Sequence, residues 1–196
     1  MAIDSILGDV EQASRRFWTG EYQEMRFLGL IDEMGSLQPA PPVAEERMKN
    51  RVPRSDIKAP DVLNEAYKYA KPSSFSRGLR ISLGSVDLLL ISGTASIDEE
   101  GRSIHIGDFR AQLWRTYRNI TQLLQAEGAS WHDIVRTSCY LRDIERDYKD
   151  FNEVRTSFFE WLQLDPLPAS TGIQARLCRE ELLVEIEAIA ALPAGR

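Results

Sequence analysis

Residues 168–190, PASTGIQARLCREELLVEIEAIA, decide how the rest of this chain is interpreted. Their pattern predicts two strands, over residues 170–177 and 182–190, joined by a charged connection. Side chains alternate between the faces of a strand, so Glu185 and Glu187 are expected together on one face, opposite their apolar neighbours. Partial burial of a carboxylate on a strand costs free energy unless the group is paired with a cation or has a functional role. This segment is therefore the first place to look for chemistry.

Hydrophobic spacing upstream predicts the other elements of the same domain. They are strands over 79–83 and 86–92, an amphipathic helix over 108–126, a strand over 134–141 and a helix over 147–163. The order ββαβαββ predicts an α+β fold in which two helices cover one face of a mixed sheet. The other face has no partner element within 72–192, and a monomer rarely exposes such an apolar surface. Another subunit or the N-terminal residues are expected to cover it.

The first part of the chain differs in pattern. We expect residues 1–71 to form an N-terminal extension and residues 72–196 to form the domain described above. The extension has helical spacing over 3–18, many large apolar and aromatic side chains over 17–34, and a proline-rich linker at 39–42. A short helix is predicted over 60–70.

The bulk composition limits the class of protein. With 196 residues, 43% hydrophobic and 28% charged, the chain resembles an ordinary globular protein. Its net charge of −6 argues against nucleic-acid binding, which requires a cationic face. Two cysteines do not make a disulfide framework, and from the residue pattern we expect neither a signal peptide nor a bilayer-spanning segment. These features predict a cytoplasmic protein with no membrane partner.

The stretch that opens this section resembles the C-terminal signature of the Rid (YjgF) superfamily, small trimeric proteins of which several hydrolyse enamines and imines. In the deaminating branch the signature opens Pro-Ala-Arg-Ser and ends in a Glu-hydrophobic-Glu strand. The end is intact here, whereas Ser170 stands in the place of the arginine. Other motifs in the family's order over 72–192 are Phe75-Ser-Arg-Gly78, Ile91-Ser-Gly-Thr94, Ala111-Gln112 with Asn119-Ile120, and Phe151-Asn-Glu153 with Phe158-Phe159.

The resemblance implies the α+β fold, a homotrimer, and sites in clefts between subunits. It gives Glu185 the role of orienting or protonating a substrate, and burial in a cleft would raise its pKa toward neutrality. The alternative is a solvated carboxylate or one paired to an arginine. Ser170, Thr171 and Gly172 begin the strand that lines the family cleft, where the Gly172 N–H could hold an oxyanion. The alternative for these three is a plain strand entry with small residues.

Two departures from the family pattern weigh against simple imino-acid deamination. Serine at position 170 cannot replace a guanidinium that binds a carboxylate with two hydrogen bonds. Phe75 stands where deaminases usually have a tyrosine, so the phenol is lost. Arg136 is the leading candidate for a replacement cation, and Thr94 is expected to line the cleft. Other candidate cations are Arg77, Arg115 and Arg176, and Trp114 is expected in the core or at a subunit interface.

We expect no metal and no cofactor, because His105 and His132 lie far apart and lack neighbouring ligands. Cys139 and Cys178 fall in apolar strand patterns and are expected to be buried.

The leading hypothesis is an enzyme of the Rid superfamily that cleaves, with water, an imine, enamine or enol-ether group in a small carboxylated metabolite. Some residues also resemble the C-terminal half of chorismatases, namely Ile97, Ser103, His105, Gly107-Asp108 and Cys178-Arg179. The alternative is a catalytically degenerate module that binds a small molecule or a protein. A weak imine deaminase is a third hypothesis.

Overall fold

The computed structural model describes residues 20–42 and 51–195, and the chain divides into two compact units, Met1–Arg51 and Val52–Arg196. The predicted helix over 3–18 and the first residues of the aromatic-rich segment lie outside the described residues. No described helix is long and apolar enough to cross a membrane.

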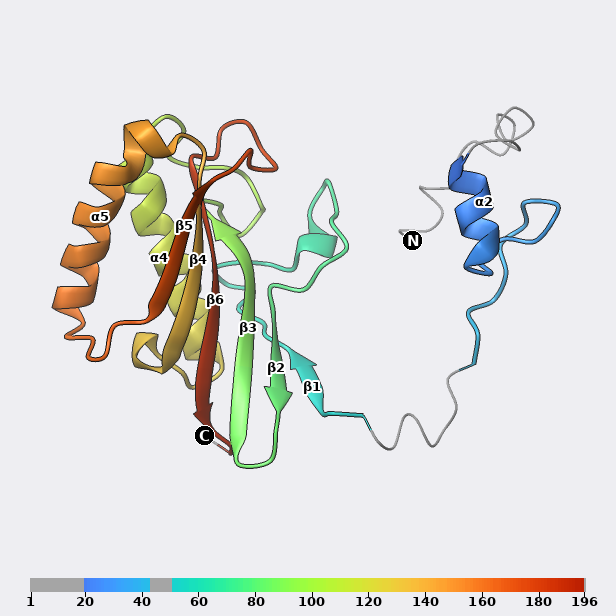
Figure 1. Ribbon diagram of the computed structural model, residues 1–196, viewed down its shortest axis with the longest axis horizontal. Helices are drawn as coiled ribbons and strands as arrows, with labels where there is room; N and C mark the ends of the chain where they lie inside the picture. Colours follow the sequence, from blue (N-terminus) through green and yellow to red (C-terminus); the bar gives the residue numbers. More distant parts are fainter. Residues whose placement is uncertain (1–19, 43–50, 196) are drawn as a thin grey trace. The chain divides into compact units, whose positions relative to one another are not determined.

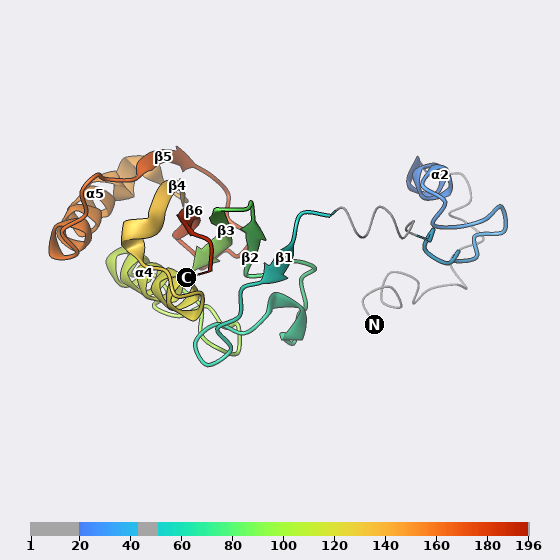
Figure 2. The same cartoon turned by 90° about the horizontal axis from the view of Figure 1, so that it is seen from below.

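The second unit is built on a six-stranded sheet with the strand order β1-β2-β3-β6-β4-β5. Neighbouring strands run antiparallel except β4 and β5, which are parallel, so the sheet is mixed. The strands are β1 (Arg54–Asp56), β2 (Gly78–Ser82), β3 (Val86–Ala95), β4 (Ile134–Leu141), β5 (Ala169–Gln174) and β6 (Val184–Pro193). Helices α4 (Phe109–Ala126) and α5 (Ile144–Trp161) cover one face (Figures 1 and 2). The predicted α+β fold is confirmed, with β1 as an additional edge strand.

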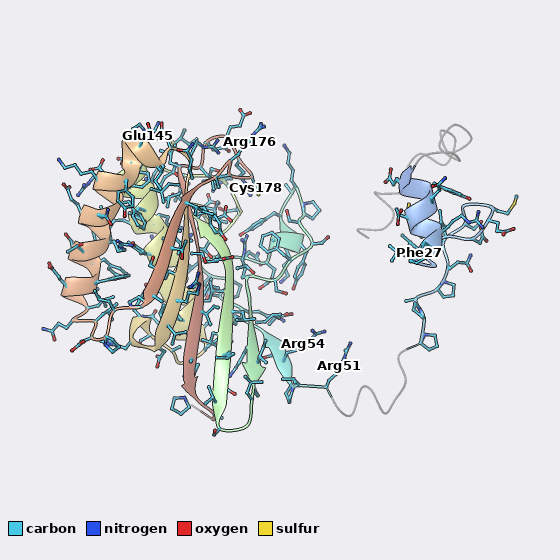
Figure 3. All side chains as sticks on the ribbon, viewed as in Figure 1. Phe27, Arg51, Arg54, Glu145, Arg176 and Cys178 are labelled. Atoms are coloured by element: carbon cyan, nitrogen blue, oxygen red, sulfur yellow. The ribbon has the colours of Figure 1, made fainter. Side chains whose placement is uncertain are left out.

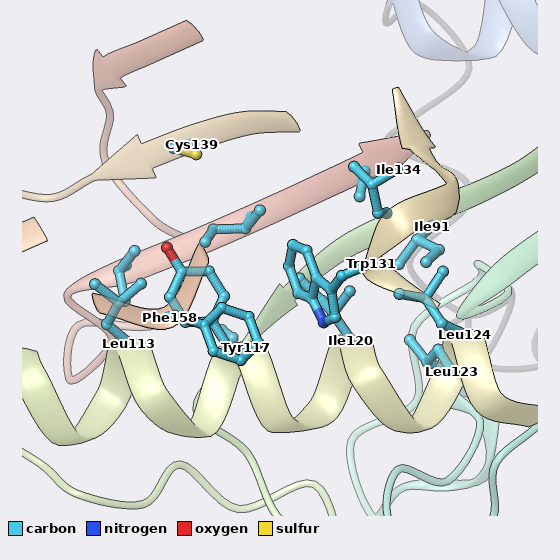
Figure 4. Close-up of a cluster of buried hydrophobic side chains, with 14 of the residues drawn as sticks. Ile91, Leu113, Tyr117, Ile120, Leu123, Leu124, Trp131, Ile134, Cys139 and Phe158 are labelled. Atoms are coloured by element: carbon cyan, nitrogen blue, oxygen red, sulfur yellow. The ribbon is translucent and has the colours of Figure 1, made fainter. Parts of the chain in front are cut away.

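The helices pack through an aromatic cluster between α4, α5 and the 3-10 turn at Trp131–Asp133. The Tyr117 ring stacks on Phe158 at a centroid distance of 4.7 Å, and Trp131 meets Phe158 edge-on at 5.1 Å. Figure 4 shows the labelled side chains of α4, among them Leu113 and Tyr117, directed toward the sheet. Burying each large side chain contributes about 1.5–3 kcal/mol, so this cluster fixes both helices against the strands.

Strand β6 lies in the middle of the sheet and shows the alternation that its sequence predicts. Ile186 is 1% exposed against the helices, and the neighbouring Val184 and Ala188 are also buried. Glu185 and Glu187 are half-buried on the opposite, open face, which no helix covers among the described residues. The open face therefore carries the carboxylates, as predicted.

Residues 52–71 belong to the second unit, ahead of the boundary expected from the sequence. Ile57 and Leu63 are fully buried in its core. The predicted helix over 60–70 is wrong: both Val62 N and Leu63 N donate to Ala59 O, and only Ala66–Lys68 forms a 3-10 turn. Burial of these apolar side chains in a turn replaces the expected helix.

The described part of the first unit is a short helix followed by a tight loop. Helix α2 (Gly20–Phe27) has no buried residue, and Phe27, labelled in Figure 3, is 88% exposed. The Asp32 carboxylate closes the loop by accepting hydrogen bonds from Met34 N and Ser36 N at 2.8 and 2.9 Å. The proline-rich linker at 39–42 has no regular structure, as its sequence predicts.

Candidate active site

A β-bulge in β3 shapes the open face beside the carboxylates. The register with β6 runs from Ile91–Ala188 to Thr94–Ile186, so Ser92 and Gly93 stand opposite one residue of β6. Side-chain hydrogen bonds hold the bulge: Thr94 Oγ1 donates to Ser92 O at 2.8 Å, and Ser92 Oγ donates to Ser76 O at 2.8 Å. The bulge keeps a fixed shape because its own side chains bond to it.

The Glu185 carboxyl group lies directly on the bulge glycine. A Cβ atom added to Gly93 would stand 2.0 Å from Glu185 Oε1, closer than real atoms approach. Any other residue at position 93 would push the carboxyl group away. The Ile-Ser-Gly-Thr motif therefore provides the space that Glu185 occupies.

The surroundings of Glu185 favour its protonated form. Burial raises the pKa of Glu185, the neighbouring Glu187 raises it further, and the positive charge of Arg77 partly opposes both. Tyr140 Oη donates to Glu187 Oε1 at 2.8 Å, and this bond, with burial, raises the pKa of Tyr140. Of the two carboxyl groups, Glu185 therefore resists ionisation, whereas Glu187 accepts a hydrogen bond from the Tyr140 phenol.

A hollow of about 320 Å³ opens on the same face. It is lined by Leu90, Ile91, Ser92, Arg136, Ser138, Glu187, Ala188 and Ile189. Its lining combines apolar side chains with a guanidinium, hydroxyls and a carboxylate, a combination suited to a small metabolite. Arg136 lines the hollow and donates from Nη2 to Thr171 Oγ1 at 3.2 Å.

Phe75 packs against Arg77, the residue whose positive charge acts on the pKa of Glu185. The Arg77 guanidinium is centred 5.3 Å from the Phe75 ring and 5.0 Å from the Tyr69 ring. Arg77 is 3% exposed, and its Nε donates to Asn64 O at 3.0 Å. The two aromatic rings therefore shelter the cation that acts on the pKa of Glu185.

The residues predicted to line the cleft at the start of β5, 170–172, lie on different faces of the sheet. Thr171 joins Arg136 on the open face, whereas Ser170 points to the helix side, where Thr137 Oγ1 donates to its Oγ at 3.0 Å. Gly172 pairs with Cys139 and shares that side. Ser170 Oγ also accepts from Arg155 Nη1 of α5 at 3.4 Å. These residues cannot all line one face of one chain.

Two further predicted positions have different surroundings from those expected. Thr94 is 1% exposed on the helix side, and its hydroxyl group supports the bulge through the bond to Ser92 O. Cys178 was expected to be buried but is exposed, because β5 ends at Gln174 and leaves it in the following loop (Figure 3). Cys139 is buried as predicted, and burial raises the pKa of its thiol.

The prediction from the sequence missed Tyr140 and Ser138. The signal for both was available, because they alternate with the buried residues of β4 and so share a face with Arg136. That Ser92 and Gly93 pair opposite Glu187 depends on the register between β3 and β6, which no local sequence pattern indicates.

The comparisons with known proteins agree with this architecture. The family model described as Endoribonuclease L-PSP matches residues 70–192. A RutC family protein of Pyrococcus abyssi is 30% identical over 124 residues, which cover 63% of this chain and 91% of that protein. The 3-aminoacrylate deaminase RutC of Acinetobacter baylyi is 29% identical over 104 residues, which cover 53% of this chain and 79% of that protein.

Among solved structures, the YjgF gene product of E. coli aligns with a TM-score of 0.56 at 23% identity, covering 69% of this chain and 97% of that one. E. coli TdcF with bound serine aligns with a TM-score of 0.57 at 24% identity, covering 70% and 98%. These two alignments support the fold. With the family model matching well over half of its length, the chain belongs to the Endoribonuclease L-PSP family.

Proposed function

We propose that this protein is a Rid-type enzyme that hydrolyses the enamine or imine group of a small carboxylated metabolite. The observation that carries the proposal is the Glu185 carboxyl group, which rests on Gly93 with its pKa raised by burial. A carboxylic acid with a raised pKa keeps its proton to higher pH than an ordinary glutamate does, which suits a general acid. The name of the Acinetobacter relative, 3-aminoacrylate deaminase, supports an enamine of this class as substrate.

In the proposed reaction Glu185 gives its proton to the enamine carbon, and the C=C electron pair forms that C–H bond. The nitrogen lone pair forms the C=N bond of an iminium ion. Water then adds to the iminium carbon and loses a proton to the Glu185 carboxylate, which restores the acid. The carbinolamine collapses to a carbonyl compound and ammonia. Proton and oxygen are supplied by the carboxyl group and water alone.

We also propose that the active form is a homotrimer with its sites between subunits. The open face carries Leu79, Ile81, Leu88 and Leu90 in register on β2 and β3 without a covering element among the described residues. An apolar sheet face of this kind is normally covered in solution. In this assembly Arg136 and Thr171 remain candidates for contact with the polar end of a ligand.

The test is ammonia release from freshly generated 2-aminoacrylate and 3-aminoacrylate. Glu185→Gln keeps the shape of the side chain but has no acidic proton, so we expect a loss of at least a hundredfold in kcat. The matched control is Glu180→Gln, at an exposed carboxyl group outside the hollow, which should retain activity. Because Glu187 raises the pKa of Glu185, Glu187→Gln should move the alkaline loss of kcat/KM to lower pH. Equal rates for Glu185→Gln and the unmodified protein would refute the proposal.

A second candidate is a binding module without turnover, favoured by Ser170 and Phe75 at positions where deaminating relatives carry arginine and tyrosine. It predicts ligand binding at the cleft with no ammonia release above the uncatalysed rate. The residues that resemble chorismatases have structural contacts: Arg179 Nη1 donates to Gly101 O at 2.5 Å and to Ser103 Oγ at 3.3 Å. Chorismate cleavage is therefore not the chemistry proposed.

A further inference from the structure

We propose that Arg155, on helix α5, supplies the substrate-binding guanidinium that this chain lacks at position 170. The inference rests on the proposed function, because it assigns the residue that holds the carboxylate of the same substrate. Ser170 alone cannot form the two parallel hydrogen bonds by which an arginine binds a carboxylate. Arg155 brings such a group to the serine from a neighbouring element.

The contacts of Arg155 place its guanidinium at the entry of β5. Nη1 donates to Ser170 Oγ at 3.4 Å, and Nη2 donates to Asn152 Oδ1 at 2.6 Å. The guanidinium carbon stands 4.8 Å from the centre of the Phe151 ring. An amide, a hydroxyl and an aromatic face thus orient the group before a ligand arrives, which lowers the entropic cost of binding.

The charge of Arg155 is not neutralised by these partners. Several other arginines pair with carboxylates, for example Arg80 with Asp87 at 2.6 Å and Arg146 with Asp147 at 2.7 Å. Within 20–42 and 51–195, no carboxylate lies at ion-pair distance from Arg155. A guanidinium fixed by neutral groups keeps its full attraction for an anion.

Arg136, the leading candidate from the sequence, is less suited to this role. It is exposed, and its one hydrogen bond to another described residue is the donation to Thr171 Oγ1. Arg136 and Glu187 line the same hollow, so an anionic ligand there would also meet the negative charge of Glu187. Arg155 is anchored by two hydrogen bonds and an aromatic ring.

The position of Arg155 also says where the rest of the site comes from. Arg155 and Ser170 lie on the helix side of the sheet, whereas Glu185 lies on the open side. One small ligand cannot touch both groups in one chain. A complete site therefore needs a second copy of this chain, with Arg155 of one copy facing Glu185 of another across the exposed outer strand β5.

Carboxylate binding can be measured without turnover by titrating the full chain with pyruvate, the product expected from 2-aminoacrylate. We expect Arg155→Gln to raise the Kd for pyruvate tenfold or more and Arg155→Lys to raise it less. The control Arg110→Gln, at an exposed arginine that pairs with Asp150 and Glu153 away from the site, should bind as the unmodified protein does. In the double variant Arg155→Ser with Ser170→Arg, the guanidinium moves to the strand and binding should recover.

Unchanged pyruvate affinity in Arg155→Gln, with a melting temperature like that of the unmodified protein, would overturn the assignment. So would loss of binding in Arg136→Gln alone. The titration also separates the two proposals. Binding that depends on Arg155 in a protein that releases no ammonia would refute the enzyme while the carboxylate site stands.

The sharing of the site between copies has its own test in co-expressed Glu185→Gln and Arg155→Gln chains. Each variant alone should be impaired, but random mixing in a ring should rebuild about a quarter of the sites from the intact Glu185 of one chain and the intact Arg155 of the other. Recovery of roughly that share of activity supports a site between copies. Mixed oligomers no more active than the better single variant would show that each chain carries both groups for its own site.

Discussion

On β6, Ile186 packs against the helices while Glu185 and Glu187, on either side of it in sequence, lie on the open face. The helix face is closed by stacked aromatic rings, and the open face has a bulge, a hollow and a carboxyl group with a raised pKa. The central strands thus carry a packed core on one side and the candidate acid on the other, while the proposed carboxylate site of Arg155 and Ser170 lies at the outer strand β5. Substitutions in the packed core should change stability most, and those around Glu185 should change activity most.

The largest expected effect on stability comes from the aromatic cluster. Phe158→Ala removes a ring that is 6% exposed and contacts both Tyr117 and Trp131, so it should lower the free energy of unfolding by about 3–5 kcal/mol. Urea unfolding followed by fluorescence measures this loss. The matched substitution Phe27→Ala, at an exposed ring, should stay within about 0.5 kcal/mol. Similar losses at the two positions would contradict the contrast between packed and exposed rings.

A smaller loss of stability and a large loss of activity are expected from Gly93→Ala. Its new methyl group would overlap Glu185 Oε1, so we expect a destabilisation of about 1–3 kcal/mol and a loss of ammonia release close to that of Glu185→Gln. Gly172→Ala is the control for stability, because a Cβ there meets nothing within 4 Å. Unfolding and rate measurements on the same samples decide it. Full activity in Gly93→Ala would mean that the site of Glu185 is not as narrow as the bulge indicates.

The smallest effect has the opposite sign and concerns Glu185 itself. Because the folded state raises the pKa of this carboxyl group, the stability that its protonated form contributes is fully present below the ordinary value of 4.5 and is lost as the pH rises through the raised pKa. Glu185→Gln should therefore be more stable than the unmodified protein at neutral pH and no more stable near pH 4. Melting temperatures across this range test it, with the exposed Glu180→Gln as control. A stability difference that does not change with pH would contradict burial of an ionisable group.

The alternation of β6 and the helix over 109–126 could be predicted because both depend on local spacing. The surroundings of Gly93 could not, because a bulge depends on which strand pairs with β3 and in what register. The side on which Ser170 lies follows from the parallel pairing of β5 with β4, which no local pattern announces.

The contact between Arg155 and Ser170 was beyond sequence reasoning for a related reason. Helical spacing places Arg155 on a helix, but the strand residue that it meets depends on how α5 packs across the sheet. The missing guanidinium at position 170 was visible in the sequence. The residue that stands beside it was not, because the two are brought together only by tertiary structure.

Strand β1, three residues long with two charged side chains, ends the sheet beside β2. Because β1 is short and charged, it offers little unpaired backbone to a strand of another chain, and this limits aggregation through the edge of the sheet. The family match begins only at residue 70, so a fragment cut to that match would lose this protective edge strand. A fragment starting at Val52 would keep it, and the short strand therefore sets where the N-terminal unit can be removed.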